Sequence, residues 1–255
     1  MLSKNTIKYI TSLKQKKFRD EFRQFVAEGD KLVSELLLSY LKIVEIFAVK
    51  EWFSAHNIAG NIKVTEVTAF ELERISGLTT PNLVIALLEI PDNEKFETIN
   101  FDNLILVLDE IKDPGNLGTI IRIADWFGIK DIICSNHTVD IYNPKVVQAT
   151  MGSIARVIVH YTELTTFLKE IPKNIPVYGT LLSGENIYTQ DLTKNGMIII
   201  GNESKGISGE LLPLIKTKLL IPSFPENNES RAESLNASIA CAIVCAEFKR
   251  RVFSC

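Results

Sequence analysis

The sequence has few of the residues from which metal sites and disulfide frameworks are built. Its 255 residues include four cysteines and three histidines. No two cysteines have the C-x-x-C spacing of a zinc or redox site, and the histidines are scattered along the chain. These absences argue against a zinc protein and against a disulfide-rich secreted protein. We therefore expect no metal site and a reducing compartment.

Long apolar runs are missing as well. No stretch of 18 or more apolar residues occurs, and the first residues, Met-Leu-Ser-Lys-Asn-Thr, lack the apolar core of a signal peptide. We expect a cytoplasmic protein that does not bind membranes. The patterns G-x-G-x-x-G and G-x-x-x-x-G-K-[ST] are also absent, which excludes the usual dinucleotide and P-loop sites.

What the sequence does contain is a regular alternation of apolar strand patterns and helical patterns. From residue 103 onward this alternation is typical of an α/β domain with a mostly parallel sheet covered on both faces. A smaller α/β pattern precedes it, and a polar stretch without clear periodicity separates the two. We predict an N-terminal domain over residues 1–90, a linker over 91–102 and a larger domain over 103–255, whose last helix begins near Ser234.

Charge is unevenly distributed along the chain. The net charge is −3, yet seven basic and two acidic residues lie between Lys4 and Arg23, so this segment carries +5 and the rest carries −8. A basic patch on an acidic protein suits the binding of phosphates at one end, although a basic run is also ordinary for a solvated helix face. The candidate RNA-binding residues are Lys14, Lys16, Lys17, Arg19 and Arg23.

The stretch Ile198–Leu211 is the centre of the predicted site. Its three isoleucines predict a strand buried on both faces, and Gly201 lets the chain turn at the end of that strand. Asn202 and Glu203 then lie at the carboxyl end of the strand, where open α/β sheets bind ligands. Ser208 is expected to cap a short helix that follows.

A second polar loop follows the predicted strand that ends at Leu108. Asp113-Pro114-Gly115 forces a turn, and we expect Asn116 to cap the next helix. Arg122 points away from the apolar face of that helix. The residues expected to be buried on this face are Leu117, Ile120, Ile121 and Ala124.

A third loop runs from Ile221-Pro222 to Ser234-Leu235-Asn236. Together with Asp113-Pro-x-Asn116-x-Gly118-x-x-x-Arg122 and Gly201-Asn202-Glu203-x-x-Gly206, it resembles the three signature motifs of the SpoU (TrmH-like) RNA 2′-O-ribose methyltransferases of the SPOUT superfamily. The segment between Pro222 and Ser234 is longer and more polar than is usual in that family. The first part of the chain is similar to the small α/β RNA-binding domain that often precedes it, through Phe25–Gly29 and Leu78–Pro81.

This resemblance implies a parallel-sheet domain with a C-terminal trefoil knot, an S-adenosylmethionine cofactor, and a homodimer packed through the knotted region. The positions that match the family's cofactor-binding backbone groups are Thr180, Gly201, Ile221 and Leu235. The positions that match its catalytic polar residues are Asn116, Arg122, Glu203, Ser234 and Asn236.

The activity implied is transfer of a methyl group to a ribose 2′-hydroxyl in structured RNA. A sulfonium methyl is strongly electrophilic, so the enzyme has to align the hydroxyl and help its proton leave. Because arginine stays charged, we expect Arg122 to stabilise the developing alkoxide and to hold a neighbouring RNA phosphate. The additional N-terminal domain favours ribosomal RNA over transfer RNA. The alternatives are a transfer-RNA ribose methyltransferase, a base-nitrogen methyltransferase of the same superfamily, and a non-catalytic RNA-binding protein.

Overall fold

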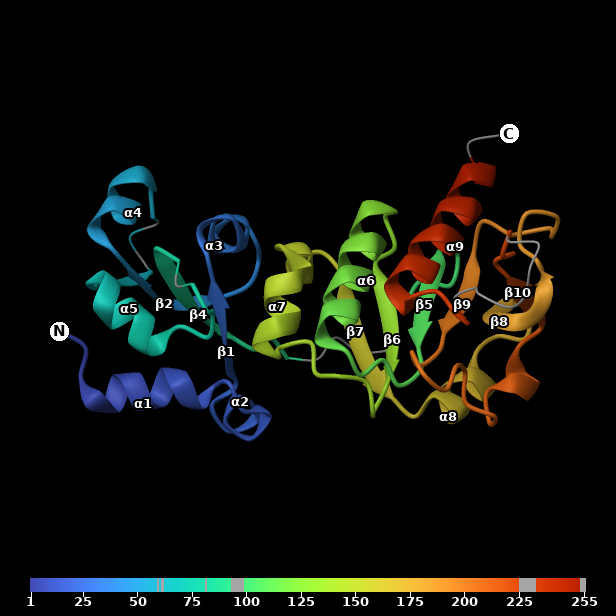
Figure 1. Cartoon of the computed structure of the whole chain (residues 1–255), viewed down its shortest axis with the longest axis horizontal. Helices are drawn as coiled ribbons and strands as arrows, with labels where there is room; N and C mark the ends of the chain where they lie inside the picture. Colours follow the sequence, from blue (N-terminus) through green and yellow to red (C-terminus); the bar gives the residue numbers. More distant parts are fainter. Residues whose placement is uncertain (59, 61, 81, 93–98, 225–232, 253–255) are drawn as a thin grey trace. The chain divides into compact units, whose positions relative to one another are not determined.

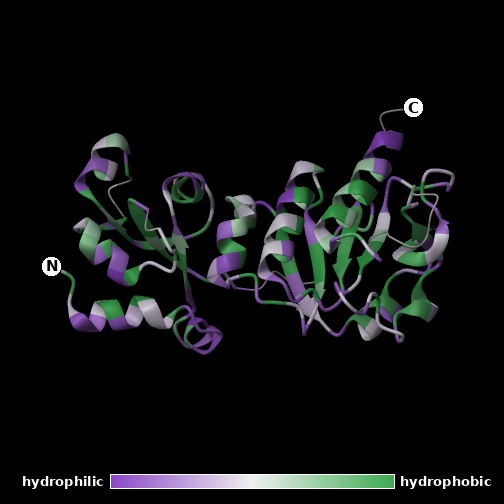
Figure 2. Cartoon of the chain, in the orientation of Figure 1, coloured by the Kyte–Doolittle hydropathy of each residue, from purple (hydrophilic) through white to green (hydrophobic). Residues whose placement is uncertain are grey.

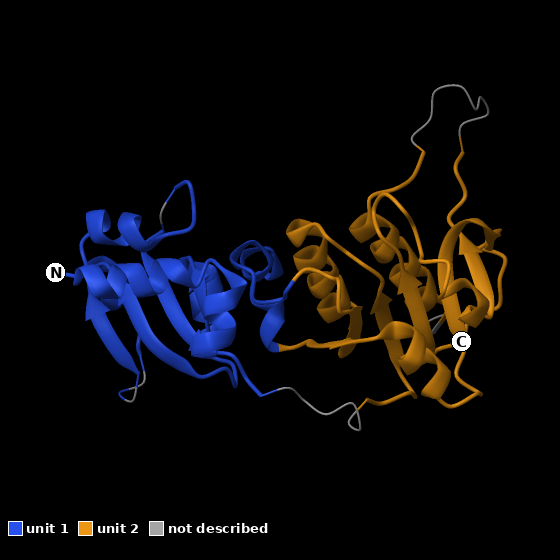
Figure 3. Ribbon diagram, turned by 90° about the horizontal axis from the view of Figure 1, so that it is seen from below, with its two compact units in different colours: residues 1–93, 140–155 blue, residues 94–139, 156–255 orange. Residues whose placement is uncertain are grey.

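The computed structural model describes residues 1–58, 60, 62–80, 82–92, 99–224 and 233–252. Its internal contacts divide the chain into two compact units, shown in Figure 3. Unit 1 contains residues 1–93 together with 140–155, and unit 2 contains residues 94–139 together with 156–255. The predicted boundaries at residues 90 and 103 stay a prediction, but residues 140–155 pack with the N-terminal residues rather than with their own sequence neighbours.

Unit 1 is built on a four-stranded mixed sheet with the order β1-β4-β2-β3. Strand β4 is antiparallel to both of its neighbours, and β2 and β3 are parallel. The first five residues of β4 are buried, as its continuous apolar run predicts. The strands are β1 (Gln24–Glu28), β2 (Ile43–Ala48), β3 (Lys63–Glu66) and β4 (Val84–Glu89). The helices are α1 (Lys4–Ser12), α2 (Lys16–Phe22), α3 (Asp30–Leu37), α4 (Lys50–Ala55), α5 (Ala69–Ile75) and α7 (Pro144–Thr150).

Unit 2 is a parallel α/β domain (Figure 1). Its six strands are all parallel and have the order β10-β8-β9-β5-β6-β7. The strands are β5 (Leu104–Leu108), β6 (Asp131–Ser135), β7 (Ile158–Thr162), β8 (Val177–Asn186), β9 (Gly196–Ile200) and β10 (Thr217–Leu220). The helices are α6 (Pro114–Trp126), α8 (Leu164–Glu170) and α9 (Ala237–Val252), with short 3₁₀ turns η2 (Ser153–Ala155, in unit 1) and η3 (Leu212–Leu214, in unit 2).

The core of unit 2 is formed by the central strands. Every residue of β5, β6 and β9 is buried, and Figure 2 shows these strands as hydrophobic. Ile105 and Val107 of β5 belong to one buried cluster with Leu164 and Leu168 of α8. Helices α6 and α9 pack against each other, as Figure 1 also shows. Burial on both faces is what the near-continuous apolar runs predict.

The strand order places two loops that are distant in sequence beside each other. Strand β5 pairs with β9 on one side and with β6 on the other. The loops that follow β5 and β9 therefore leave the same edge of the sheet at the point where the strand order reverses, which is where α/β sheets bind ligands. The parallel-sheet fold class is confirmed, and the trefoil knot stays a prediction.

Three predicted helix starts are corrected by the structure. Helix α6 is capped by Asp113, whose Oδ1 accepts from the Asn116 N–H at 2.8 Å, and Pro114 fills the first helical position. Ser208 begins no helix, since only the 3₁₀ turn η3 follows. Helix α9 begins at Ala237 and not at Ser234. Because Asp113 caps α6, the side chain of Asn116 can make a different contact.

Two findings concern membranes and metals. Within the described residues, no helix combines the length and apolar character needed to cross a membrane. The same part of the chain contains no group of three or more His, Cys, Asp or Glu side chains placed to hold a metal ion. The long loop predicted from the sequence over residues 223–233 falls mostly outside the described residues.

Candidate active site

The carboxyl end of the unit 2 sheet borders a cavity of about 560 Å³. This volume lies in the range of small-molecule sites, about 300–1,000 Å³. Its walls come from the middle of β8, the ends of β9 and β10, the loop after β9, the residues that follow β10, and the start of α9. The four predicted cofactor positions all line it: Thr180, Gly201, Ile221 and Leu235. The fold thus brings together residues from β8, from the loop after β9 and from the segment between β10 and α9 around one hollow.

Gly201 is required by the shape of the loop that lines this cavity. A Cβ atom at this position would lie 2.3 Å from the carbonyl carbon of Gly206 and 2.4 Å from the nitrogen of Ile207. Both are backbone atoms, which cannot rotate away. The loop folds back on itself because the backbones of Asn202 and Gly206 exchange two hydrogen bonds of 2.9 Å. A larger residue at Gly201 would force this turn open.

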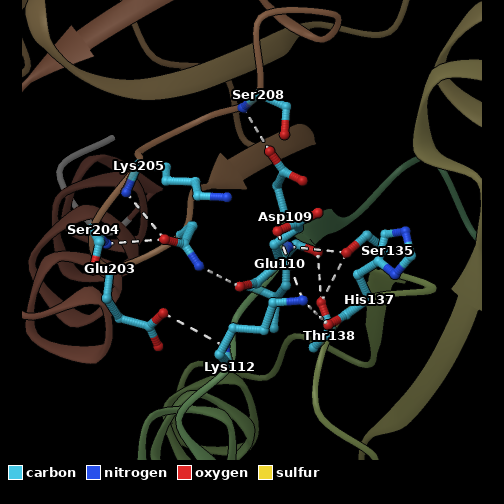
Figure 4. A network of polar contacts seen from close by, with 12 residues as sticks. Asp109, Glu110, Lys112, Ser135, His137, Thr138, Glu203, Ser204, Lys205 and Ser208 are labelled. Atoms are coloured by element: carbon cyan, nitrogen blue, oxygen red, sulfur yellow. Dashed lines mark hydrogen bonds and ion pairs between the residues drawn. The ribbon is translucent and has the colours of Figure 1, made fainter.

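Two contacts hold the β9 loop against the β5 loop (Figure 4). The buried carboxylate of Asp109 accepts from the Ser208 N–H at 2.7 Å. The side chain of Asn202 donates from Nδ2 to the carbonyl oxygen of Glu110 at 2.8 Å, and its Oδ1 accepts from two N–H groups of its own loop. Asp109 and Ser208 were not predicted as a pair. The sequence did hold one indication of this contact, since Asp109 is an acidic residue directly after a fully buried strand.

The loop after β6 supports the β5 loop from the other side. The Glu110 N–H donates to Ser135 Oγ at 2.9 Å, and Ser135 Oγ lies 3.1 Å from Thr138 Oγ1. Thr138 Oγ1 in turn donates to the Leu108 carbonyl oxygen at 3.3 Å. Figure 4 shows these contacts. Glu110 has a positive φ of 54°, a conformation uncommon for residues other than glycine, and this support holds it there.

A chain of side-chain hydrogen bonds joins the three predicted motifs. Asn116 Nδ2 donates to Glu203 Oε1 at 2.9 Å. Asn236 Nδ2 donates to Asn116 Oδ1 at 2.8 Å. Asn236 Oδ1 accepts from Ser238 Oγ at 2.7 Å and from the Ser238 N–H at 2.9 Å. The chain therefore runs from the β9 loop through the start of α6 to the start of α9.

Glu203 sets the direction of this chain. An ionised carboxylate only accepts hydrogen bonds, so Asn116 has to present its NH₂ group to Glu203, and its oxygen is left to accept from Asn236. Glu203 also accepts from the backbone N–H groups of Lys112 and Asp113, at 3.4 and 3.3 Å, next to the start of α6. The N-terminal end of a helix favours a negative charge.

The remaining two predicted catalytic residues do not join the chain. Ser234 lines the cavity and is exposed. Arg122 lies further along α6 on the exposed face, as its position in the helical pattern predicts, while the four residues predicted to be buried are fully buried. Within the described part of the chain, the Arg122 guanidinium has no hydrogen-bond or ion-pair partner. Its catalytic role stays a prediction.

The prediction that Arg19 binds RNA is wrong. Arg19 is only 2% exposed, and its guanidinium forms an ion pair with Asp140 at 2.6 Å within unit 1. It also donates to the carbonyl oxygens of Leu13 and Lys14, at 2.9 and 3.0 Å. Arg19 therefore stabilises the turn between α1 and α2 and has no free donor face for a phosphate. Its partner is 121 residues away in sequence, so the charge pattern could not reveal it.

The other basic candidates differ in their surroundings. Lys16 and Lys17 are exposed in α2. Lys14 Nζ donates to the Ser76 carbonyl oxygen at 2.8 Å, and Arg23, half exposed, donates to the Pro91 carbonyl oxygen at 2.9 Å. Their role in RNA binding stays a prediction.

Two family models match separate parts of the chain. Residues 103–246 match the SpoU rRNA Methylase family, and residues 4–86 match the MRM3-like substrate binding domain. The chain is 30% identical over 91% of its length, and 91% of the relative's, to the Bacillus subtilis protein named 23S rRNA (guanosine(2553)-2′-O)-methyltransferase RlmP.

Two solved structures agree over nearly the whole chain. A TrmH-family protein from Porphyromonas gingivalis is 36% identical, with a TM-score of 0.88 over 98% of this chain and 99% of that one. An AdoMet-bound rRNA methyltransferase from Sinorhizobium meliloti is 32% identical, with a TM-score of 0.86 over 99% and 97%. On its three connected motifs, and on a family match over more than half of its length, the chain belongs to the SpoU rRNA methylase family.

Proposed function

We propose that this protein transfers a methyl group from S-adenosylmethionine to the 2′-hydroxyl of a ribose in ribosomal RNA. The observation that carries the proposal is the hydrogen-bonded chain Glu203–Asn116–Asn236 beside the cavity of unit 2. It is supported by the Bacillus subtilis relative, which is named as a 23S rRNA 2′-O-methyltransferase, and by the AdoMet-bound Sinorhizobium meliloti structure.

The cavity fits the cofactor in two respects. Its lining combines apolar side chains with backbone groups at strand ends, a mixture that suits an adenosine joined to an amino acid. The second is the shape of the wall at Gly201, where the backbone of Gly206 and Ile207 fills the place of a Cβ, so that only glycine allows the turn that lines the cavity. Thr180, Gly201, Ile221 and Leu235 would hold the cofactor. When bound, S-adenosylmethionine supplies an electrophilic methyl group.

The connected polar residues act as positioning residues. The carboxylate of Glu203 orients Asn116, and Asn116 orients Asn236, so the three motifs are held in one arrangement. A chain of two amides has no group that titrates near neutral pH, so it is suited to orientation and not to proton transfer. Fixed geometry of this kind accelerates a displacement by aligning the hydroxyl with the methyl group.

Arg122 is proposed as the residue that contacts the RNA. Its guanidinium stays charged and offers five N–H donors, which suits a phosphate and a developing alkoxide. Within the described residues nothing neutralises it. The proton of the 2′-hydroxyl would then pass to the neighbouring phosphate or to water, since the arginine cannot accept it.

The chain is also proposed to act as a homodimer. Trp126 of α6 is 85% exposed and Ile239 of α9 is about half exposed, and these two helices pack against each other. We propose these two side chains as candidates for the interface between the copies. A second copy of the chain is the partner that the family resemblance implies.

The test is transfer of labelled methyl groups to unmodified large-subunit, small-subunit and transfer RNA, with the Arg122→Ala variant as comparison. We expect the wild type to label ribosomal RNA, and nuclease digestion of that RNA to leave the label in resistant dinucleotides. The Arg122→Ala variant should transfer no label. Label in transfer RNA alone, or on a base, would replace the proposed substrate. A protein that binds no cofactor and transfers no label would be an RNA-binding protein that keeps the fold.

A further inference from the structure

Unit 1 contains a second cavity, which the proposed chemistry does not use. It has a volume of about 400 Å³ and is bordered by the end of α2, the start of β1, the loop before β2 and the end of β4. Two aromatic side chains, Phe22 and Tyr40, and two cationic ones, Arg23 and Lys42, line it. The two aromatic groups at one hollow point to a flat ligand that stacks on them.

The two aromatic side chains are exposed. Tyr40 is 65% exposed and Phe22 is 39% exposed, whereas Phe25 and Phe47 of the same unit are buried in its core. Exposed aromatic side chains gathered at a cavity are not needed for the core of the unit. They offer apolar faces on which another flat group can stack.

Phe22 is held in place by other rings. It contacts Tyr9 edge-on, with ring centroids 5.0 Å apart, and stacks with Phe18 at 6.3 Å and an interplanar angle of 12°. Lys17 Nζ lies 5.3 Å from the centroid of the Phe18 ring. Because its neighbours restrain it, Phe22 loses little conformational freedom when a ligand binds.

The polar groups of the cavity are largely neutralised. Lys42 forms an ion pair of 2.7 Å with Glu89, and Arg23 lies 3.5 Å from Asp92. Gln24 lines the same cavity, and its Oε1 accepts from the Tyr9 hydroxyl, so its NH₂ group is the part left for a ligand. A free phosphate would bind only weakly here, because the positive and negative side chains of the cavity nearly cancel. A neutral ring with hydrogen-bonding edges fits it better.

We propose that this cavity binds an unpaired nucleobase of the RNA substrate, stacked on Phe22 and Tyr40. The inference rests on the proposed function, because it takes RNA as the ligand. Proteins recognise structured RNA through unstacked bases of loops and bulges, which they stack on aromatic side chains. The exposed lysines of α2, Lys16 and Lys17, are close in sequence to Phe22 and suit contacts with the flanking phosphates.

The two kinds of contact are separable by their salt dependence. Loss of a stacking ring should weaken binding of single-stranded RNA by about 5- to 100-fold, with an unchanged dependence on salt. Loss of Lys16 and Lys17 should instead reduce the slope of affinity against salt, because fewer counterions are released.

The experiment uses the full chain and a short fluorescent single-stranded RNA of mixed sequence, with the same RNA in a duplex for comparison. Tyr40→Ala should weaken binding of the single strand about tenfold and leave duplex binding unchanged, and Tyr40→Phe should bind as the wild type does. The matched control is Phe70→Ala, which removes a ring of unit 1 that is 68% exposed, has Arg74 at 6.0 Å, and lies outside the cavity lining.

The outcomes separate this inference from the proposed activity. Equal affinity of Tyr40→Ala, Phe70→Ala and wild type for the single strand, with each variant folded by its thermal unfolding curve, overturns the nucleobase site. That result leaves methyl transfer untouched. A wild type that transfers no methyl group to any RNA overturns the proposed activity, while a selective loss of single-strand binding in Tyr40→Ala still supports the cavity as the RNA contact.

Discussion

The side-chain amide of Asn116 donates to Glu203 Oε1 at 2.9 Å, and this contact joins two loops that are 87 residues apart in the sequence. It ties the start of α6 to the loop after β9, and that loop lines the cavity. Because the same amide accepts from Asn236, the arrangement of the third loop depends on it as well. The contact is therefore the best place to perturb the site without touching the cofactor positions.

Glu203→Gln should slow methyl transfer about tenfold or more and weaken cofactor binding. Glutamine can donate as well as accept, so the direction of the amide chain is no longer set, and a hydrogen bond to a charged group contributes about 1.5–3 kcal/mol. Turnover and calorimetric cofactor affinity would be measured beside Glu210→Gln, which changes an exposed glutamate after the same loop. Equal behaviour of the two variants would contradict the orienting role.

Gly201→Ala should abolish cofactor binding and lower the stability of unit 2. The added methyl group meets backbone atoms of Gly206 and Ile207, and overpacking of this kind costs about 1–3 kcal/mol. Gly209→Ala is the matched control, because a Cβ there has no neighbour within 4 Å. Urea unfolding and cofactor titration of both variants test the prediction, which fails if Gly201→Ala binds cofactor normally.

Asp109→Ala should loosen the β9 loop. It removes the acceptor of the Ser208 N–H from a partly buried hydrogen bond, and a bond of this kind contributes about 0.5–1.5 kcal/mol. Hydrogen exchange at the Ser208 amide should become faster, and cofactor affinity should fall. Asp109→Asn keeps an oxygen acceptor of the same shape and should restore much of the protection. If the amide exchanged at the wild-type rate in Asp109→Ala, the loop would have another anchor.

Trp126→Glu should convert the proposed dimer to a monomer. Burying a carboxylate in an apolar interface without a partner is strongly unfavourable. The molar mass from light scattering would be compared with that of Leu38→Glu, which places the same charge at an apolar residue after α3 that is 91% exposed. A monomeric wild type, or a dimeric Trp126→Glu variant, would exclude this surface as the interface.

Glu163 links the stability of unit 2 to pH. This residue caps α8, and hydrogen bonds from the Thr166 hydroxyl and from the N–H groups of Thr166 and Thr165 lower its pKa to about 2. A carboxyl whose pKa is depressed on folding stabilises the folded state above its ordinary pKa of 4.5, and that stabilisation is lost as the pH falls towards 2.

The wild type should therefore resist urea better than Glu163→Gln at pH 7, and the difference should shrink as the pH falls below 4.5. Glu170→Gln, at the other end of α8, is the control and should show no such convergence. A difference between wild type and Glu163→Gln that stays constant from pH 7 to pH 3 would show that the charge of the cap is not involved.

Much of the scaffold follows from local pattern. The apolar runs of β5 and β9 predicted strands buried on both faces, and the helical spacing after Asp113 predicted which face of α6 is buried. Gly201 was singled out because a polar loop turns sharply after a buried strand, and the structure shows backbone packed where its side chain would be. The cytoplasmic location and the knot were implied by composition and resemblance and stay predictions.

Other features were decided by tertiary structure alone. Asn116 looked like a helix cap, but Asp113 takes that place and Asn116 turns to Glu203 and Asn236. Arg19 looked like part of a phosphate-binding patch, but it is buried against Asp140. The sequence by itself determined which segments are buried and where the chain turns, because hydrophobic periodicity and turn chemistry act over a few residues. Which polar side chains become partners was decided only when the order of the strands placed distant loops at one edge.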